Sequence, residues 1–318
     1  MRLNRKRNTR ETIYRVIIVV LTTFAIVFSS VTAPVAVADM SLSKAVDKLI
    51  HAHETVFANS YAKVDFTDSN RTGTVKINTA FVLTKRAKVT IAKDGESYTY
   101  DLKSDMTVEA YPLQMGNGEY TVKVLEQHAG IQYKLVLTAI HNVNLEHKYA
   151  PYLHPNQYVN YHEDSVVVKI ATELTKHAKS DLEKVEIIYN YVVKSLKYDS
   201  HKAATVQSGY LPSVDDIIEA GMGICFDYAA VLTAMLRAVS IPAKLIVGYV
   251  EDPNGGEPLY HAWSKFYLDE GEFSINASRI NDSNLVRVDP TFDSGAKSNR
   301  KFLQFVSDDN NYTKLAKY

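Results

Sequence analysis

The stretch Gly221-Met222-Gly223-Ile224-Cys225-Phe226-Asp227-Tyr228-Ala229 decides how the rest of this sequence is interpreted. Residues 226–239 have a helical pattern, in which one side carries Ala229, Leu232, Leu236 and Val239. Ile241-Pro242 ends that pattern. We therefore predict that Cys225 lies in or beside the first turn of a helix. The two glycines before it would allow a tight turn and the close approach of a substrate.

The predicted position of Cys225 matters because the thiolate, not the thiol, is the nucleophile. A free thiol, with a pKa of about 8.5, is ionised to only a few per cent at neutral pH. A helix N-terminus or a neighbouring imidazolium can lower the pKa of a thiol to roughly 3.5–7.5. Cys225 is the only cysteine of the chain, so no disulfide can form within it. The alternative interpretation is a buried structural thiol.

A histidine and an aspartate further along the chain are candidates to act with this thiol. Residues 244–250 have a strand-like composition, and a returning strand carries His261 on one face with Trp263, Lys265 and Tyr267. A histidine on the hairpin after a cysteine-capped helix is a candidate general base. Asp289 ends a further strand just before Pro290 and could orient the imidazole. Taken singly, a packed strand histidine and a turn aspartate remain the alternatives.

Four motifs in order resemble the transglutaminase-like superfamily: Gly-Ile-Cys-Phe-Asp-Tyr-Ala (223–229), Ile-Pro-Ala-Lys (241–244), His-Ala-Trp (261–263) and Val-Asp-Pro-Thr-Phe (288–292). The resemblance covers residues 160–295. It implies a papain-like α+β fold, in which the cysteine helix packs on an antiparallel sheet that carries the histidine and the aspartate. It also implies that Cys225 is the nucleophile, His261 the base and acid, and Asp289 the orienting carboxylate.

Some features depart from the family pattern or stay open. Leu285 stands in the neighbourhood where the family often has an aromatic residue, and residues 268–284 form a polar insert. Tyr198 is a candidate for the second oxyanion donor, with packing as the alternative role. No cluster of residues has metal-ligand spacing, so we expect neither a cofactor nor a metal.

The N-terminal residues 1–38 have the three parts of a secretory signal peptide. The first fifteen residues are basic, residues 16–38 carry no charge, and Ala36-Val37-Ala38 precedes Asp39. An uncleaved membrane anchor is the alternative. Pro34 and the short apolar run argue against a full span, which needs roughly 20 residues. We therefore expect a secreted protein, extracellular or in the cell envelope, with no stable membrane insertion after cleavage.

Cleavage at this point would leave a weakly acidic protein. The chain has 36 basic and 36 acidic residues, and residues 1–38 remove six and one, which leaves 30 against 35. A net charge of 30 − 35 = −5 gives no electrostatic reason to expect nucleic-acid binding. That class of function is therefore set aside.

We predict two domains after the signal peptide. Residues 39–155 would form an N-terminal helix, over residues 42–56, plus a β-rich part. Residues 85–145 alternate with period two and break at Asp94-Gly95 and at 116–118, which is typical of a small antiparallel β-sandwich. The proline-containing segment 149–160 would be the linker, and residues 156–318 the transglutaminase-like catalytic domain.

Local signals also predict the helices that precede Cys225. Ser180-Asp181-Leu182-Glu183 is a capping box, and Leu182, Val185, Tyr189, Val192 and Leu196 then share one helical face. This helix should end near residues 197–199. A second cap at Ser213 would open a short helix that stops at Gly221.

The sequence thus predicts an extracellular thiol acyl-transfer enzyme that uses a Cys-His-Asp triad on amide bonds of a protein or peptide substrate, with the cell wall as one setting. The motifs do not separate a peptidase or amidase from a cross-linking transglutaminase, because only the acyl acceptor differs. The alternative from another class is a non-catalytic cell-envelope binding protein with a relic triad.

Overall fold

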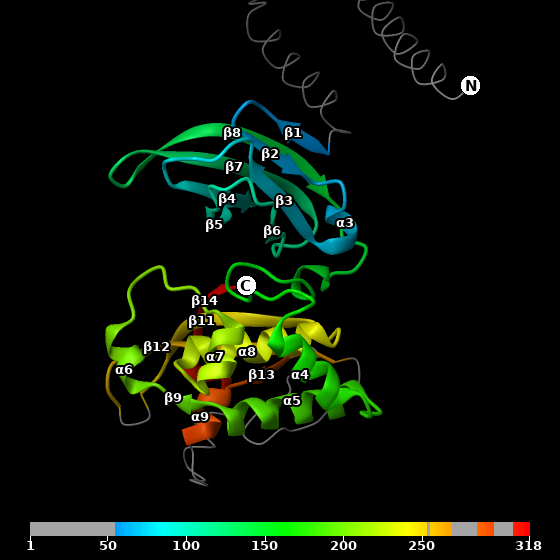
Figure 1. Ribbon diagram of the computed structural model, residues 1–318, viewed down its shortest axis with the longest axis vertical. Coiled ribbons are helices and arrows are strands. Elements are labelled where there is room, and N and C mark those ends of the chain that lie inside the picture. Colours follow the sequence, from blue (N-terminus) through cyan, green and yellow to red (C-terminus); the bar gives the residue numbers. More distant parts are fainter. Residues whose placement is uncertain (1–54, 253–254, 269–284, 296–307) are drawn as a thin grey trace, which may run out of the picture. The chain divides into compact units, whose positions relative to one another are not determined.

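The computed structural model describes residues 55–252, 255–268, 285–295 and 308–318 (Figure 1). The predicted signal peptide, most of the predicted helix over residues 42–56 and nearly all of the insert 268–284 lie outside these residues. In the part of the chain that is described, no helix combines the length and the apolar character needed to cross a membrane.

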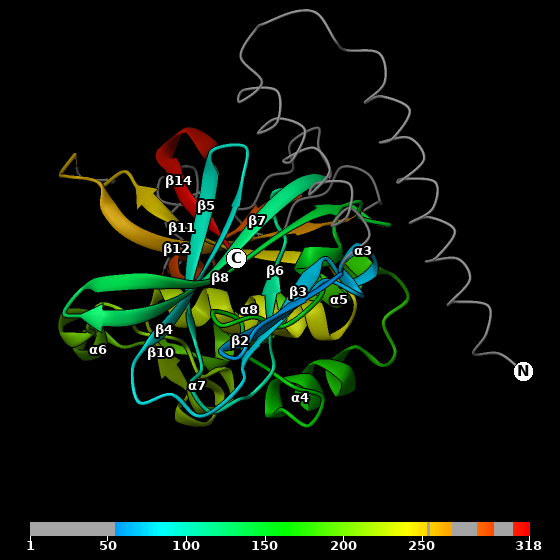
Figure 2. The same ribbon diagram turned by 90° about the horizontal axis from the view of Figure 1, so that it is seen from above.

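Two four-stranded antiparallel sheets form the β-rich part. The first has the order β1-β2-β3-β6 and the second the order β5-β4-β7-β8. The strands, which Figure 2 shows from above, are β1 (Val56–Ala58), β2 (Ala62–Asp65), β3 (Thr74–Thr79), β4 (Ala87–Lys93), β5 (Glu96–Leu102), β6 (Glu109–Pro112), β7 (Gly118–Ala129) and β8 (Gln132–Val143).

One buried apolar cluster joins the two sheets. Val64, Val75 and Ile77 come from the first sheet and are fully buried. From the second sheet, Val89 and Val124 lie in the same cluster. Two antiparallel sheets that share one core form a β-sandwich, so the predicted sandwich-like architecture is confirmed.

The prediction from period-two alternation began at residue 85 and was incomplete. It did not include β1, β2 and β3, whose alternating stretches are short. It also grouped Ile131 and Leu135 on one face of a strand, but their side chains are 95% and 55% exposed. The register of β7 and β8 shifts between Val124 and Leu125, and the hairpin end beyond that bulge carries no buried face.

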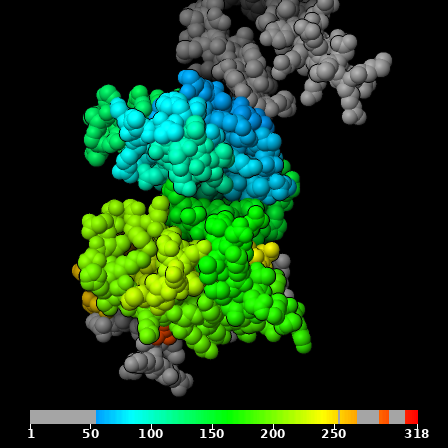
Figure 3. Space-filling model, in the orientation of Figure 1, coloured from blue at the N-terminus to red at the C-terminus, as the bar shows by residue number. Residues whose placement is uncertain are grey.

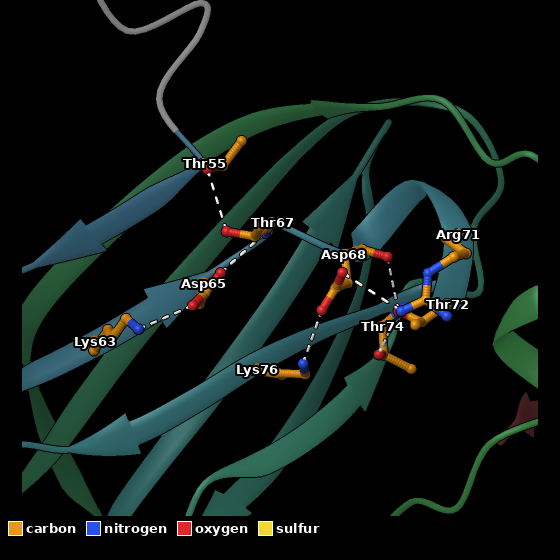
Figure 4. A network of polar contacts seen from close by, with 9 residues as sticks. All are labelled: Thr55, Lys63, Asp65, Thr67, Asp68, Arg71, Thr72, Thr74 and Lys76. Atoms are coloured by element: carbon orange, nitrogen blue, oxygen red, sulfur yellow. Dashed lines mark hydrogen bonds and ion pairs between the residues drawn. The ribbon is translucent and has the colours of Figure 1, made fainter. Parts of the chain in front are cut away.

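Ion pairs lie beside the short helix α3 (Ser69–Thr72) and on the neighbouring strands of the first sheet (Figure 4). Lys76 on β3 donates to the Asp68 carboxylate at 3.0 Å, and Lys63 lies 2.9 Å from Asp65 on β2. The hydrogen bond and then the charge of Lys76 hold the pKa of Asp68 below its ordinary value. These side chains are largely exposed, so each pair contributes little to stability.

The second part of the chain combines helices with a mixed-length antiparallel sheet of order β13-β12-β11-β14. Figure 1 shows the helices gathered on that sheet. The elements are α4 (Val166–Thr175), α5 (Asp181–Ser195), β9 (Lys197–Tyr198), α6 (Ser200–Thr205), α7 (Val214–Ala220), β10 (Met222–Gly223), α8 (Cys225–Ala238), β11 (Ala243–Val250), β12 (Leu259–Tyr267), β13 (Leu285–Val288), α9 (Pro290–Gly295) and β14 (Tyr312–Lys317), with 3-10 turns at Ala150–Tyr152 and Asp309–Asn311.

Helix α8 is the central element of this part. Leu232 and Leu236 have no exposed surface, and Thr233 shares a hydrogen bond of 3.1 Å with Ser264 of β12. The helix packs against β11 and β12 and is enclosed by α4, α5 and α7. A cysteine-bearing helix packed on an antiparallel sheet is the fold that the sequence predicted.

The helix signals before Cys225 were mostly accurate. The Ser180 hydroxyl accepts a hydrogen bond from the Glu183 backbone N–H at 3.1 Å, as the capping box predicts. Val185, Tyr189 and Val192 are buried on the predicted face. Helix α5 ends at Ser195, slightly before the predicted end, because Lys197–Tyr198 pairs with β10 instead. Ser213 precedes α7, but its side chain makes no capping hydrogen bond there.

Candidate active site

Cys225 is the first residue of α8 and is half-buried. Gly221 ends α7 in the left-handed conformation, with φ 64°, which glycine adopts without strain. A Cβ at Gly223 would lie 2.6 Å from the Cβ of Asp227. Packing against Asp227 at the start of α8 therefore requires a glycine at position 223. The predicted tight turn is made by Gly221.

His261 and Asp289 form a buried pair. His261 Nε2 lies 2.7 Å from Asp289 Oδ2, and the two residues are 5% and 1% exposed. His261 lies on β12, whereas Asp289 follows β13, and the pairing of Ser264 with Val288 places these strands side by side. Because Nε2 is engaged with the carboxylate, Nδ1 is the ring nitrogen left for another partner.

The Cys225 side chain lies close to this pair, because it is among the groups that raise the pKa of His261. The structure therefore brings together the three residues that the sequence singled out. Burial by itself lowers the pKa of His261. The charge and hydrogen bond of Asp289, together with the contact with Cys225, outweigh it and raise that pKa from 6.5 to about 10. The raised pKa favours the protonated form of the imidazole beside the thiol.

Two aromatic residues complete the surroundings of the pair. The Tyr312 hydroxyl donates to Asp289 Oδ2 at 3.1 Å, and the Phe292 backbone N–H donates to Oδ1 at 3.3 Å. The Phe292 ring stacks on His261 with centroids 4.6 Å apart. Burial and then the charge of Asp289 raise the pKa of Tyr312, so its hydroxyl keeps its proton and donates. Phe292 belongs to the quoted motif, but sequence reasoning missed Tyr312, for which the chain offers no local signal.

Tyr198 and Tyr260 flank the thiol from β9 and β12. The two residues are 48% and 63% exposed. Burial, and next the charge of Cys225, raise the pKa of each phenol, so both keep their protons at neutral pH. Tyr198 thus lies close enough to interact electrostatically with Cys225, which a second oxyanion donor at this position would need to do. Tyr260 has the same relation to the thiol and was not singled out from the sequence.

No metal centre is evident within the described ranges, where no three His, Cys, Asp or Glu side chains are grouped to hold an ion. The arrangement is instead that of a thiol, a protonated imidazole and a carboxylate in sequence. Such a set can generate a thiolate, attack a carbonyl carbon and return a proton to a leaving group.

Comparison with known families supports the resemblance over part of the chain. Residues 168–277 match the family model described as the transglutaminase-like superfamily, a stretch that includes Cys225 and His261 and ends before Asp289. No curated protein matches the chain.

Solved structures with a detectable likeness are distant. A candidate cysteine protease from Cytophaga hutchinsonii is 16% identical, with a TM-score of 0.39 over 75% of this chain and 73% of that one. A candidate protease from Parabacteroides distasonis is 18% identical, with a TM-score of 0.28 over 48% of this chain and 36% of that one. Red sea bream transglutaminase is 12% identical, with a TM-score of 0.30 over 74% of this chain and 54% of that one.

Proposed function

We propose that the protein is a thiol acyl-transfer enzyme acting on amide bonds of a protein or peptide, and the match of residues 168–277 to the transglutaminase-like superfamily supports this. In this proposal Cys225 is the nucleophile, His261 the general base and acid, and Asp289 the residue that orients the imidazole. The observation that carries the proposal is the 2.7 Å contact of His261 with Asp289, in a buried pair whose histidine also has Cys225 among the groups that raise its pKa.

The reaction would proceed through a thioester. The Cys225 thiolate attacks the amide carbonyl carbon, and the carbon–nitrogen bond then breaks. His261 gives its proton to the departing amine. A water molecule or an amine next attacks the thioester and loses a proton to His261, which releases the Cys225 thiol or thiolate and the acyl product. Water gives hydrolysis, and a lysine amine gives a cross-link.

Each residue has a physical reason to take its role. Cys225 begins α8, where the partial positive charge of the helix N-terminus favours an anion. The buried carboxylate of Asp289 keeps His261 protonated, and this imidazolium favours the thiolate beside it. Tyr198, which keeps its hydroxyl proton, would supply the second oxyanion donor beside the Cys225 backbone N–H.

The setting and the domain plan also belong to the proposal. We propose that the protein is exported through the signal peptide 1–38 and acts outside the cell or in its envelope, on a protein or peptide substrate. We also propose the division into 39–155 and 156–318. Two separate buried clusters support it, one around Val75 and Val124 and the other around Val185 and Leu232. Hydrolysis is the acyl transfer that we favour, with cross-linking as its variant.

The test is a pH series of iodoacetamide alkylation on folded wild type, His261→Ala and a His177→Ala control. His177 is an exposed histidine after α4. Alkylation of the wild type and of the control should stay fast at pH 6, where an ordinary thiol is ionised to less than about 1%. His261→Ala should lose this reactivity, because no imidazolium remains.

A wild-type profile centred near pH 8.5 and unchanged by His261→Ala would overturn the proposed function. It would favour the non-catalytic envelope-binding alternative. Turnover of a peptide amide library, with release of amine and loss of activity in Cys225→Ser, is the positive result that the proposal requires.

A further inference from the structure

A buried carboxylate lies two residues after the reactive thiol. Asp227, in the first turn of α8, has no exposed surface. Its Oδ2 accepts a hydrogen bond at 2.9 Å from the backbone N–H of Ile224, the residue before Cys225. A carboxylate at this position stabilises the start of the helix. The same negative charge opposes a thiolate on Cys225, because a nearby like charge disfavours ionisation.

A lysine from another element lies on this carboxylate. Lys202 of α6 places its Nζ 2.6 Å from Asp227 Oδ2, and the Tyr210 hydroxyl donates to Oδ1 at 2.7 Å. Lys202 Nζ also donates to the Tyr210 oxygen at 2.6 Å and lies 4.4 Å from the centre of its ring. The Lys202 side chain is 27% exposed, whereas the Asp227 side chain has no exposed surface. In Figure 3 the yellow-green residues of this region are at the surface.

The backbone around Lys202 is tied to the entrance of α8. Asp199 caps α6 by accepting from the Lys202 N–H at 2.9 Å. The Asp199 N–H donates to the carbonyl of Gly223 at 3.0 Å, two residues before Cys225. The position of the Lys202 ammonium is therefore fixed relative to the cysteine through both its main chain and its side chain.

We propose that Lys202 is a positioning residue for the thiol, which cancels the charge of Asp227 so that the helix cap and a thiolate coexist. This inference rests on the proposed function. Lys202 acts through Asp227. The Asp227 carboxylate still accepts the hydrogen bond that caps α8, and the positive charge of Lys202 offsets the repulsion between this carboxylate and a thiolate on Cys225. Removing one partner of such a buried pair leaves the other charge uncompensated.

The other ionisable groups around Cys225 lie on different elements. From β12 the thiol faces His261 and Tyr260, and from β9 it faces Tyr198. Asp289 acts behind His261, and Asp216 of α7 interacts with Tyr210. His261 thus supplies positive charge near the thiol, and Lys202 offsets the negative charge of Asp227, two residues further along α8.

The experiment compares alkylation profiles of the full folded chain with iodoacetamide as the probe. Lys202→Met should move the midpoint of the profile upward by about one pH unit, a tenfold loss of thiolate at a given pH. Lys202→Arg keeps the charge and should keep the wild-type midpoint. Lys184→Met is the matched control, because Lys184 is 29% exposed and pairs with Asp181 at the same 2.6 Å on α5.

A charge cycle separates electrostatics from folding. The double variant Lys202→Met with Asp227→Asn has neither charge and should return to within about 0.3 pH unit of the wild type. Tyr210→Phe removes a hydrogen bond and no formal charge, so its midpoint should move by less than that of Lys202→Met.

Two results would overturn the inference: a Lys202→Met profile that coincides with the wild type, or equal shifts in Lys202→Met and Lys202→Arg. Should Asp227→Asn fail to fold, the contrast between those two single variants decides the question. Failure of the proposed function has a different signature, namely a wild-type profile that His261→Ala leaves unchanged.

Discussion

Asp289→Asn should change the charge state of His261 near neutral pH. The substitution keeps the size of the side chain and removes the charge that lies 2.7 Å from Nε2. Burial lowers the pKa of His261, and the Asp289 carboxylate is the main contribution that reverses this effect. Losing an opposite charge at such range shifts a pKa by roughly 1–3 units, or about 1.4–4 kcal/mol.

The pKa of His261, about 10 in the wild type, should therefore fall in the variant. A fall of roughly 1–3 units would place it between about 7 and 9. At pH 8.5 the wild-type imidazole would remain almost entirely protonated, and that of the variant would be partly or largely neutral. The alkylation of Cys225 should slow in parallel at pH values above the lowered pKa of His261, since the thiolate then loses its counter-ion.

Stability should show the same linkage. Since the pKa of His261 is raised from 6.5 to about 10, its protonation stabilises the folded chain fully below pH 6.5. This contribution is lost as the pH rises from 6.5 through about 10, and it amounts to at most about 5 kcal/mol. In Asp289→Asn the decline of unfolding free energy over this range should be shallower.

The assay is an NMR titration of histidine ring nitrogens in labelled protein, followed from pH 5 to 10. Asp293→Asn is the control: Asp293 lies on α9, four residues further on, and accepts a hydrogen bond from Tyr189. In Asp293→Asn, the titration midpoint of His261 should stay within about 0.5 pH unit of the wild-type value. If the His261 midpoint in Asp289→Asn also stays within this range, the charge of Asp289 is not what keeps His261 protonated, and the prediction is wrong.

Three further predictions concern the surroundings of this pair and the start of the mature chain. Gly223→Ala should lower unfolding free energy by about 1–3 kcal/mol in denaturant titration, because its Cβ would lie 2.6 Å from that of Asp227; a loss below the experimental error would contradict the packing reason. Tyr312→Phe removes a hydrogen bond to the Asp289 carboxylate and should cost about 1–3 kcal/mol, with a lower melting temperature and unchanged α5 capping; an unaltered melting temperature would argue against that bond. N-terminal sequencing of exported protein should begin at Asp39, and a full-length product extracted from membranes would favour the anchor instead.

Short-range signals were enough to predict much of the second part of the chain. The capping box at Ser180, the helix after Cys225 and the alternation around His261 each involve residues within a few positions of one another. Such signals depend on hydrogen bonds and periodicities that a single element contains. The β-sandwich was predictable where long strands alternate. Strands β1, β2 and β3 were not predicted, because their alternating stretches are short and only their pairing with neighbouring strands identifies them.

The candidate reactive residues are recognisable along the chain: one cysteine at a helix start, a histidine on a following hairpin and an aspartate after a strand. The contact of His261 with Asp289 at 2.7 Å, across 28 positions, depends on the folded chain. So do the hydrogen bond from Tyr312 to the same carboxylate and the contact of Lys202 with Asp227. These contacts join separate elements, and strand order and helix packing set them. The chain encodes that order through the burial of its whole core, which no local pattern contains.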